Sequence, residues 1–274
     1  MKLWETAFYR NSLKSGLSSM MLCFIFSGLL LLLTLFFYPQ IASSGLREAL
    51  EEITQAFPSE MLHWFGLDQI PDFTVYEHYL SGALQVQLLI GCIVSSFLGT
   101  TALIRYESQH SIVFLYAQSI SRLSIVCTKF VCQLTLLALY NIGIFLIVYL
   151  ISAAFVAQAS IFLLAMLRVM FAFLLAELLY LCVGFFLSGC LSHSSQSLST
   201  AIMLVIATLL FGMMSSMFSG LGFLRYLCPY LYFQVYPLIS GNPMTFSYIL
   251  ICLLFSVVCV AACGIRYQRK DFQI

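Results

Sequence analysis

The sequence predicts an all-α integral membrane protein with six transmembrane helices. Its composition, its long charge-free stretches and the uneven distribution of its basic residues all indicate this fold class. Of the 274 residues, 62% are hydrophobic and only 8% are Asp, Glu, Lys or Arg. Charged residues make up about a quarter of an ordinary soluble protein, so this chain has too little charge to solvate a globular surface. We therefore expect residues 1–274 to form a single transmembrane domain in contact with membrane lipid.

The charge-free stretches divide into six segments of the length that a spanning helix needs, about 20 mostly apolar residues. A short link, residues 154–161, separates the third segment from the fourth. The serine-rich run 192–197 separates the fourth from the fifth, because the uncharged stretch that contains it is too long for one helix. The predicted spans are residues 18–38, 81–104, 124–153, 162–191 and 198–219, and a last one from after Pro243 to near Gly264.

Most of the basic residues fall in segments that lie on one side of the membrane in this arrangement. They are Lys2, Arg10, Lys14, Arg105, Arg122, Lys129, Arg266, Arg269 and Lys270. The loop 39–80, on the other side, has one basic residue, Arg47, against seven acidic ones. Because short cytoplasmic loops are enriched in Lys and Arg, we predict that both termini are cytoplasmic and that the loop 39–80 is extracytoplasmic. The expected location is a cell membrane, which we take to be a bacterial cytoplasmic membrane.

The sequence lacks the motifs of several enzyme classes. It has neither a G-x-x-x-x-G-K-S/T loop for nucleotide phosphates nor a G-x-S-x-G nucleophile motif. Its four histidines are far apart and lack the spacing of metal ligands. The net charge of +1 provides no basic surface for nucleic acid. We therefore predict no catalytic, cofactor-binding or metal-binding residues on this chain, and no nucleic-acid partner.

The cytoplasmic segment 105–122 combines polar residues with a short apolar cluster. Glu107 lies near the start of a short predicted helix, where a negative charge suits the positive end of the helix dipole. The apolar residues from Ile112 to Tyr116 suit contact with a partner protein or with the bilayer surface. An ordinary amphipathic loop is the alternative interpretation.

This segment resembles the membrane subunits of ABC-2 type ABC transporters. Their second cytoplasmic segment typically reads Glu, a few residues, Ser or Thr, an apolar stretch, then Pro-x-Ser-Arg and a Lys. The matching residues here are Glu107, Ser111, Ile112, Ser121, Arg122 and Lys129. The sequence departs from the family at Ser119, where the family usually has proline. The resemblance extends over nearly the whole chain, through the six spans to a basic tail.

The resemblance implies the permease subunit of an ABC exporter, whose ATP and Mg are bound by a separate ATPase subunit. In that family the segment between the second and third spans forms a coupling helix, which docks into the ATPase. The residues expected to couple the two subunits are Glu107, Ser111, Ile112, Phe114, Tyr116 and Arg122. A second permease copy, or a homologous permease, is the other partner that the resemblance implies.

Two further segments fit this family pattern. Residues 1–15 are predicted to form an amphipathic elbow helix at the membrane surface, with a disordered tail as the alternative. Residues 220–243 contain three prolines and several aromatic residues, so they do not form one straight helix. We expect them to form a re-entrant extracytoplasmic segment before the last span.

Small residues recur every four positions on three of the predicted spans. The three ladders are Gly91, Ser95 and Gly99; Gly184, Ser188 and Ser192; and Thr208, Gly212, Ser216 and Gly220. Helices in lipid approach one another through small residues, either within one subunit or between subunits. The family resemblance places the first and fifth spans at the dimer interface. The ladder on the fifth span is therefore the predicted subunit contact.

Glu177 is the one acidic residue deep inside a predicted span. An intramembrane carboxyl indicates either a functional group, on a substrate path or at a proton-sensitive contact, or a hydrogen-bonded structural group inside the bundle. Asn141 and Gln133 on the third span are candidate partners. The alternative to a transporter is a membrane-embedded enzyme or immunity factor that acts alone and uses Glu177.

Overall fold

The computed structural model describes residues 3–43, 75–104, 122–153, 159–191 and 193–269. Within these residues, six helices are long and apolar enough to cross a membrane, which confirms the predicted number of spans. They are α1 (Leu3–Phe36), α5 (Tyr76–Thr101), α8 (Arg122–Ser152), α9 (Ala159–Ser188), α10 (Ser197–Met217) and α12 (Phe246–Arg269). Apart from the start of α1, each end lies within five residues of its predicted position.

The structure differs from expectation in the first part of the chain, which forms α1 and then the short helix α2 (Tyr38–Ser43). The predicted elbow, residues 1–15, is not a separate helix, because α1 runs without a break from Leu3 into the first span. Near its start α1 already packs on α8, where the hydroxyl oxygens of Tyr9 and Thr135 are 2.8 Å apart. Gly16 of α1 lies against Leu136 of α8, and this glycine does not interrupt α1. A position of this segment at the membrane surface stays a prediction.

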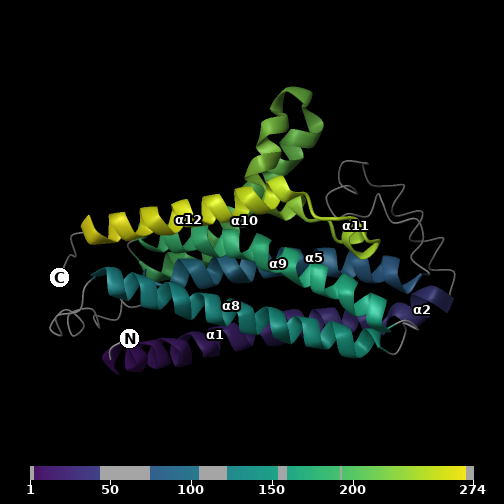
Figure 1. Ribbon diagram of the computed structural model, residues 1–274, viewed down its shortest axis with the longest axis horizontal. Helices are drawn as coiled ribbons and strands as arrows, with labels where there is room; N and C mark the ends of the chain where they lie inside the picture. Colours follow the sequence, from purple (N-terminus) through teal and green to yellow (C-terminus); the bar gives the residue numbers. More distant parts are fainter. Residues whose placement is uncertain (1–2, 44–74, 105–121, 154–158, 192, 270–274) are drawn as a thin grey trace.

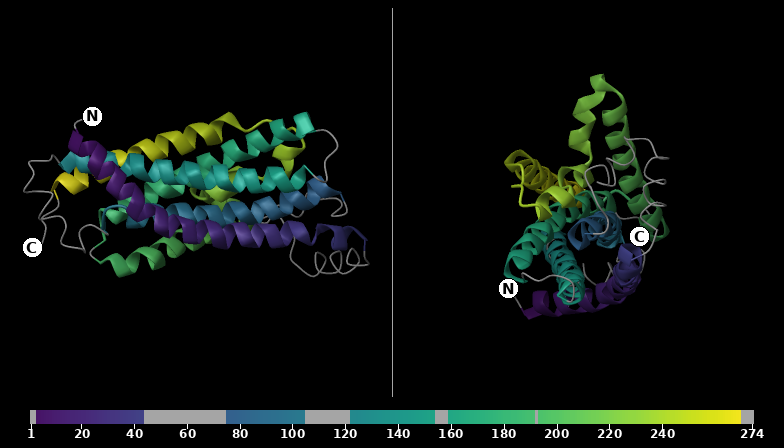
Figure 2. Two further views of the ribbon diagram at one scale, coloured as in Figure 1. Left: turned by 90° about the horizontal axis from the view of Figure 1, so that it is seen from below. Right: turned by 90° about the vertical axis from the view of Figure 1, so that its right-hand side faces the viewer.

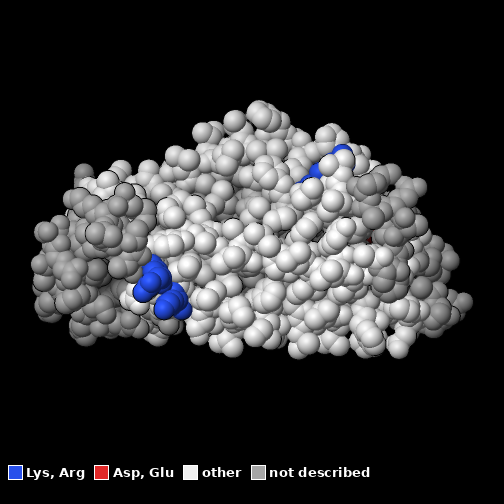
Figure 3. All heavy atoms as spheres, turned by 60° about the horizontal axis from the view of Figure 1, so that its bottom comes forward, with Lys and Arg blue, Asp and Glu red and all other residues white. Residues whose placement is uncertain are grey.

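Apart from α10, the long helices run roughly along one axis, and the start of α1 and the end of α12 lie at the same end of the bundle (Figure 1). The helices α5 and α9 form its centre, since they bury most of their apolar span whereas the other four bury a minority. The helices α1 and α8 pack together beside this pair, and α12 packs on α9 (Figure 2). On the face drawn in Figure 3, Lys and Arg side chains form two small groups, and the surface between them is uncharged.

The backbones of α5 and α9 touch where Gly99 faces Gly184. A Cβ atom on Gly99 would lie 2.4 Å from the carbonyl oxygen of Leu181. A Cβ atom on Gly184 would lie 2.6 Å from the carbonyl oxygen of Ser96. Both distances are too short for any side chain, so the contact requires glycine on both helices. Two of the three predicted ladders therefore pack against each other within one subunit.

The next residue of the α9 ladder, Ser188, holds the end of α5. Its hydroxyl oxygen accepts hydrogen bonds from the backbone N–H groups of Leu103 and Ile104, at 3.0 and 3.1 Å. These two residues follow the end of α5 at Thr101, and both are buried. A buried N–H group without a partner is costly, so Ser188 satisfies two donors at this end of the bundle. The following segment, residues 105–121, lies outside the described residues, as does the loop 44–74.

The first half of α10 packs on α5. The Thr100 hydroxyl donates to the carbonyl oxygen of Ser197 at 3.0 Å, and the Ser96 hydroxyl donates to that of Ala201 at 3.3 Å. Toward its end, α10 forms a projecting hairpin with η2 (Ser219–Leu227), drawn in light green in Figures 1 and 2. We call this element the α10–η2 hairpin.

The predicted re-entrant segment 220–243 contains η2 and two further short helices, η3 (Pro229–Tyr232) and α11 (Val235–Ile239). The two later helices return to the bundle at Gln85 of α5. The Tyr230 hydroxyl donates to the Gln85 carbonyl oxygen at 3.4 Å, and the Val235 N–H donates to the Gln85 side-chain oxygen at 2.9 Å. The expectation that this segment is not one straight helix is confirmed. Its depth in the membrane stays a prediction.

The contact between α5 and α9 gives a first testable prediction. We expect Gly184→Ala to destabilise the fold by about 1–3 kcal/mol, because the added methyl group meets backbone atoms that have no room to move. The matched control is Gly222→Ala, since a Cβ atom there would have no neighbour within 4 Å. Unfolding of the purified variants by sodium dodecyl sulfate measures the difference. Equal stability of the two variants would contradict the close backbone contact.

Candidate functional site

A buried carboxyl lies at the centre of the bundle. Glu177 of α9 is 1% exposed, and its Oε2 accepts a hydrogen bond from the Asn141 side-chain amide of α8. The same amide nitrogen also donates to the carbonyl oxygen of Leu137 at 3.2 Å. The structure therefore brings together the two intramembrane polar residues that the sequence singled out. The other candidate partner, Gln133, is buried on α8 and its side-chain oxygen has no hydrogen-bond partner.

The helix α5 makes room for this carboxyl at Gly91. A Cβ atom on Gly91 would lie 1.9 Å from Oε1 of Glu177, so any larger residue would collide with the carboxyl. We predicted Gly91 as a residue at which another helix approaches closely. The atoms that lie against it belong to the Glu177 side chain and not to a helix backbone. Sequence reasoning missed this pairing, because a glycine ladder does not show which of its members faces a large polar side chain.

A second group of polar side chains continues the first toward α1. Gln87 of α5 donates to the Tyr140 hydroxyl at 3.0 Å, and that hydroxyl donates to Ser27 of α1 at 3.1 Å. Tyr140 is the neighbour of Asn141, and Gln87 lies one turn before Gly91 on α5. All three side chains are almost fully buried. None of these three residues was predicted from the sequence. Gln87 could have been singled out, because it lies one helical turn from Gly91 on the same face of the helix.

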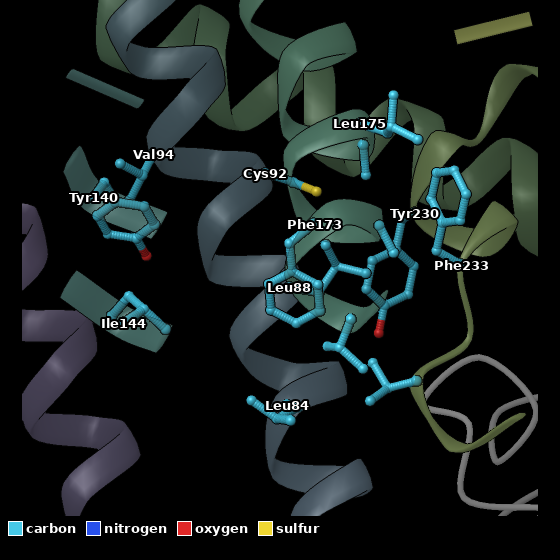
Figure 4. Close-up of a cluster of buried hydrophobic side chains, with 14 of the residues drawn as sticks. Leu84, Leu88, Cys92, Val94, Tyr140, Ile144, Phe173, Leu175, Tyr230 and Phe233 are labelled. Carbon is cyan, nitrogen blue, oxygen red and sulfur yellow. The ribbon is translucent and has the colours of Figure 1, made fainter. Parts of the chain in front are cut away.

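We call Ser27, Gln87, Tyr140, Asn141 and Glu177 the polar core. It links four helices, α1, α5, α8 and α9. Leu84, Leu88 and Phe173 belong to the same buried hydrophobic cluster as Tyr140, and Figure 4 draws these four side chains. Hydrogen bonds between helices stabilise bundles in lipid, where water offers no alternative partner. The geometry suits a polar contact that holds helices together, and it leaves the carboxyl enclosed.

At the end of the bundle where both termini lie, two cations tie α8 to its neighbours. Arg122, the first residue of α8, donates to the backbone oxygen of Gln268 near the end of α12 at 3.0 Å. The Lys129 ammonium group lies 5.0 Å from the centre of the Phe8 ring of α1, in cation–π geometry. Of the predicted coupling residues, Arg122 is the described one. Glu107, Ser111, Ile112, Phe114 and Tyr116 lie outside the described residues.

The predicted interface ladder on α10 and η2 has two different halves. The hydroxyl oxygen of Thr208 is 2.8 Å from that of Tyr180 on α9, and a Cβ atom on Gly212 would lie 2.7 Å from Leu231. These two residues therefore face their own subunit. Ser216 is exposed, and a Cβ atom on Gly220 would have no neighbour within 4 Å.

The fit between Gly91 and Glu177 is testable by a double-mutant cycle. We expect Gly91→Ala to cost about 1–3 kcal/mol of stability, because the methyl group overlaps the carboxyl. In a Glu177→Ala background the cost should fall, since the colliding atoms are gone. Glu177→Gln is the matched control, because its amide has the size of the carboxyl and should retain the cost. Costs that simply add in detergent unfolding experiments would contradict the contact.

Comparison with known proteins agrees with this architecture. A family model described as ABC-2 family transporter protein matches residues 18–272, which is all of this sequence but its first 17 and last two residues. Among curated proteins, no sequence matches the chain. The family match covers far more than half of the chain, and it contains the last five spans whole and the first span from residue 18 onward. The chain therefore belongs to the ABC-2 family of transporter proteins.

Proposed function

We propose that this chain is the permease subunit of an ABC exporter, driven by ATP that a separate subunit binds with Mg and hydrolyses. The observation that carries the proposal is the family match over six spans. A membrane domain of this kind receives its work through contact with the ATPase. We propose the segment 105–122 as that contact, and both termini as cytoplasmic.

The packing of α8 supports this route. The segment 105–121 leads directly into α8, whose first residue, Arg122, is bonded to α12. About two turns further along α8, Lys129 contacts Phe8 of α1. Deeper in the bundle, Asn141 binds Glu177 of α9. A displacement imposed at the start of α8 would therefore act on three other helices through named contacts.

The enzyme alternative is less well supported. Glu177 is enclosed by the bundle, and its hydrogen bond to Asn141 suits a contact between helices better than attack on a substrate. Co-purification distinguishes the two functions. A stoichiometric ATPase in the complex supports the transporter, whereas full activity of the isolated chain supports an enzyme or immunity factor that acts alone.

The coupling proposal predicts a loss of ATPase binding in segment variants. Phe114→Ala or Tyr116→Ala should each weaken binding by about 2 kcal/mol or more, the cost of truncating a buried hot-spot residue. Glu107→Lys places a cation at a helix N-terminus, so we expect coupling to fall even where the complex still forms. Pull-down of the ATPase, together with substrate-stimulated ATP hydrolysis in reconstituted complexes, measures both effects.

The control for these variants is Phe246→Ala, an exposed aromatic residue at the start of α12, the end of that helix away from the segment 105–121. It should leave both measurements unchanged. Wild-type binding and stimulation in a chain with Phe114, Tyr116 and Glu107 all substituted would show that coupling runs elsewhere. The serine-rich residues 192–199 would then be the next candidates.

We also propose that two permeases pair through the outer half of the interface ladder. Ser216 is exposed, and within the described residues its hydroxyl donates to the Met213 carbonyl oxygen of its own helix, at 2.8 Å. Gly212 instead faces Leu231 and Cys228 of its own subunit. Gly212 and Ser216 are therefore neighbouring small residues of the same ladder, but Gly212 contacts the rest of its own subunit whereas Ser216 is exposed.

These contacts predict opposite outcomes for two leucine substitutions. Ser216→Leu should weaken pairing and leave the stability of one subunit unchanged, because a large side chain prevents close approach of a second helix. Gly212→Leu should lower the stability of the subunit itself, since its side chain meets Leu231. Cross-linking in membranes measures pairing, and detergent unfolding measures stability. Unchanged pairing in Ser216→Leu would place the interface elsewhere.

A further inference from the structure

A cavity of about 170 Å³ lies between α9, α12 and the α10–η2 hairpin. Its floor is formed by buried side chains, Leu179 and Tyr180 of α9 and Tyr232 of η3. Its mouth is formed by exposed side chains on three elements. They are Phe211 of α10, Tyr226 and Leu227 of η2, and Phe255 of α12, which are 39 to 56% exposed.

The cavity offers almost no polar surface. The hydroxyl group of Tyr180 is hydrogen-bonded to Thr208, and that of Tyr232 donates to the carbonyl oxygen of Tyr226. The remaining wall is aliphatic and aromatic carbon, including Leu204 and Ile251. Water in a cavity needs two or more polar partners, so a cavity of this chemistry does not favour water. Its lining suits a hydrocarbon group.

The mouth lies at the depth of the apolar spans. Phe255 is nine residues after the start of α12, about 13 Å along the helix axis. Phe211 is six residues before the end of α10, about 9 Å. Exposed apolar residues such as Leu210 and Leu254 continue the surface beside the mouth. In a membrane, this opening therefore faces the acyl chains of lipid.

We propose that the cavity binds the end of an acyl chain of a membrane lipid. An unfilled cavity of this kind loses dispersion contacts along its whole wall, and the bilayer supplies hydrocarbon at its mouth. A dry cavity of about 150 Å³ is known to hold a benzene molecule, so this one has room for several methylene groups. The chain end fills the space between α12 and the α10–η2 hairpin and joins the hairpin to the bundle.

The test uses the full chain in vesicles of phosphatidylethanolamine and phosphatidylglycerol, with no ATPase. A small share of the lipid has a diazirine near the end of one acyl chain, and mass spectrometry locates the sites of photolabelling. We expect label on the floor, at Leu179 or Tyr180. Lipid that only coats the outer surface does not reach these α9 residues.

Filling the cavity should remove this label. Val183→Phe from α9 and Leu204→Phe from α10 each place a ring in the cavity, and two independent variants guard against failure of one to fold. The control is Leu253→Phe, an exposed residue of α12 that does not line the cavity. Floor label lost in both filling variants and retained in the control supports the site.

Two results would overturn the inference. In the first, the floor of the wild-type chain stays unlabelled while exposed residues such as Leu253 and Leu254 are labelled, which proves that the probe was present at this depth. In the second, floor label persists unchanged in both filling variants. Either result is independent of the proposed transport function, because the experiment requires neither ATP nor substrate.

Discussion

The contact of Gly99 with Gly184 sets the geometry on which the rest of the bundle depends. Lipid provides little hydrophobic attraction between helices, so α5 and α9 are held by close packing and by hydrogen bonds. Both helices run in the same direction, and their backbones touch near the end where the chain termini lie. This contact fixes the axial register of the central pair, and the remaining four helices pack around it.

The polar core follows from that register. Gly91 precedes Gly99 by eight residues, and Glu177 precedes Gly184 by seven, which places both about 11 Å further along the same two helices. A shift of one residue would move the glycine away from the carboxyl and bring a larger side chain against it. The close contact of Gly99 with Gly184 therefore determines whether the Glu177 carboxyl fits against Gly91. The acid in turn fixes α8 through Asn141.

The spans could be predicted from the sequence, because a charge-free apolar stretch of sufficient length has few other solutions in a bilayer. The interpretation of the small-residue ladders was incomplete for a physical reason. Spacing identifies the face of a helix that approaches something, whereas the partner depends on tertiary packing. Gly184 meets a backbone, Gly91 meets a carboxyl, and Ser188 meets two N–H groups. The early start of α1 was also missed, since the amphipathic pattern of residues 1–15 suggested a separate element.

Ser188 has a consequence for how the protein transmits force. It fastens the end of α5 to α9, just before the segment 105–121 begins, and Arg122 fastens the far end of that segment to α12. The described residues on either side of this segment are thus bound to two different helices, α9 and α12. In the coupling route that we propose, a load on the segment would reach the bundle at both of these contacts. The spacing between α9 and α12 at this end of the bundle is then the quantity that such a load changes.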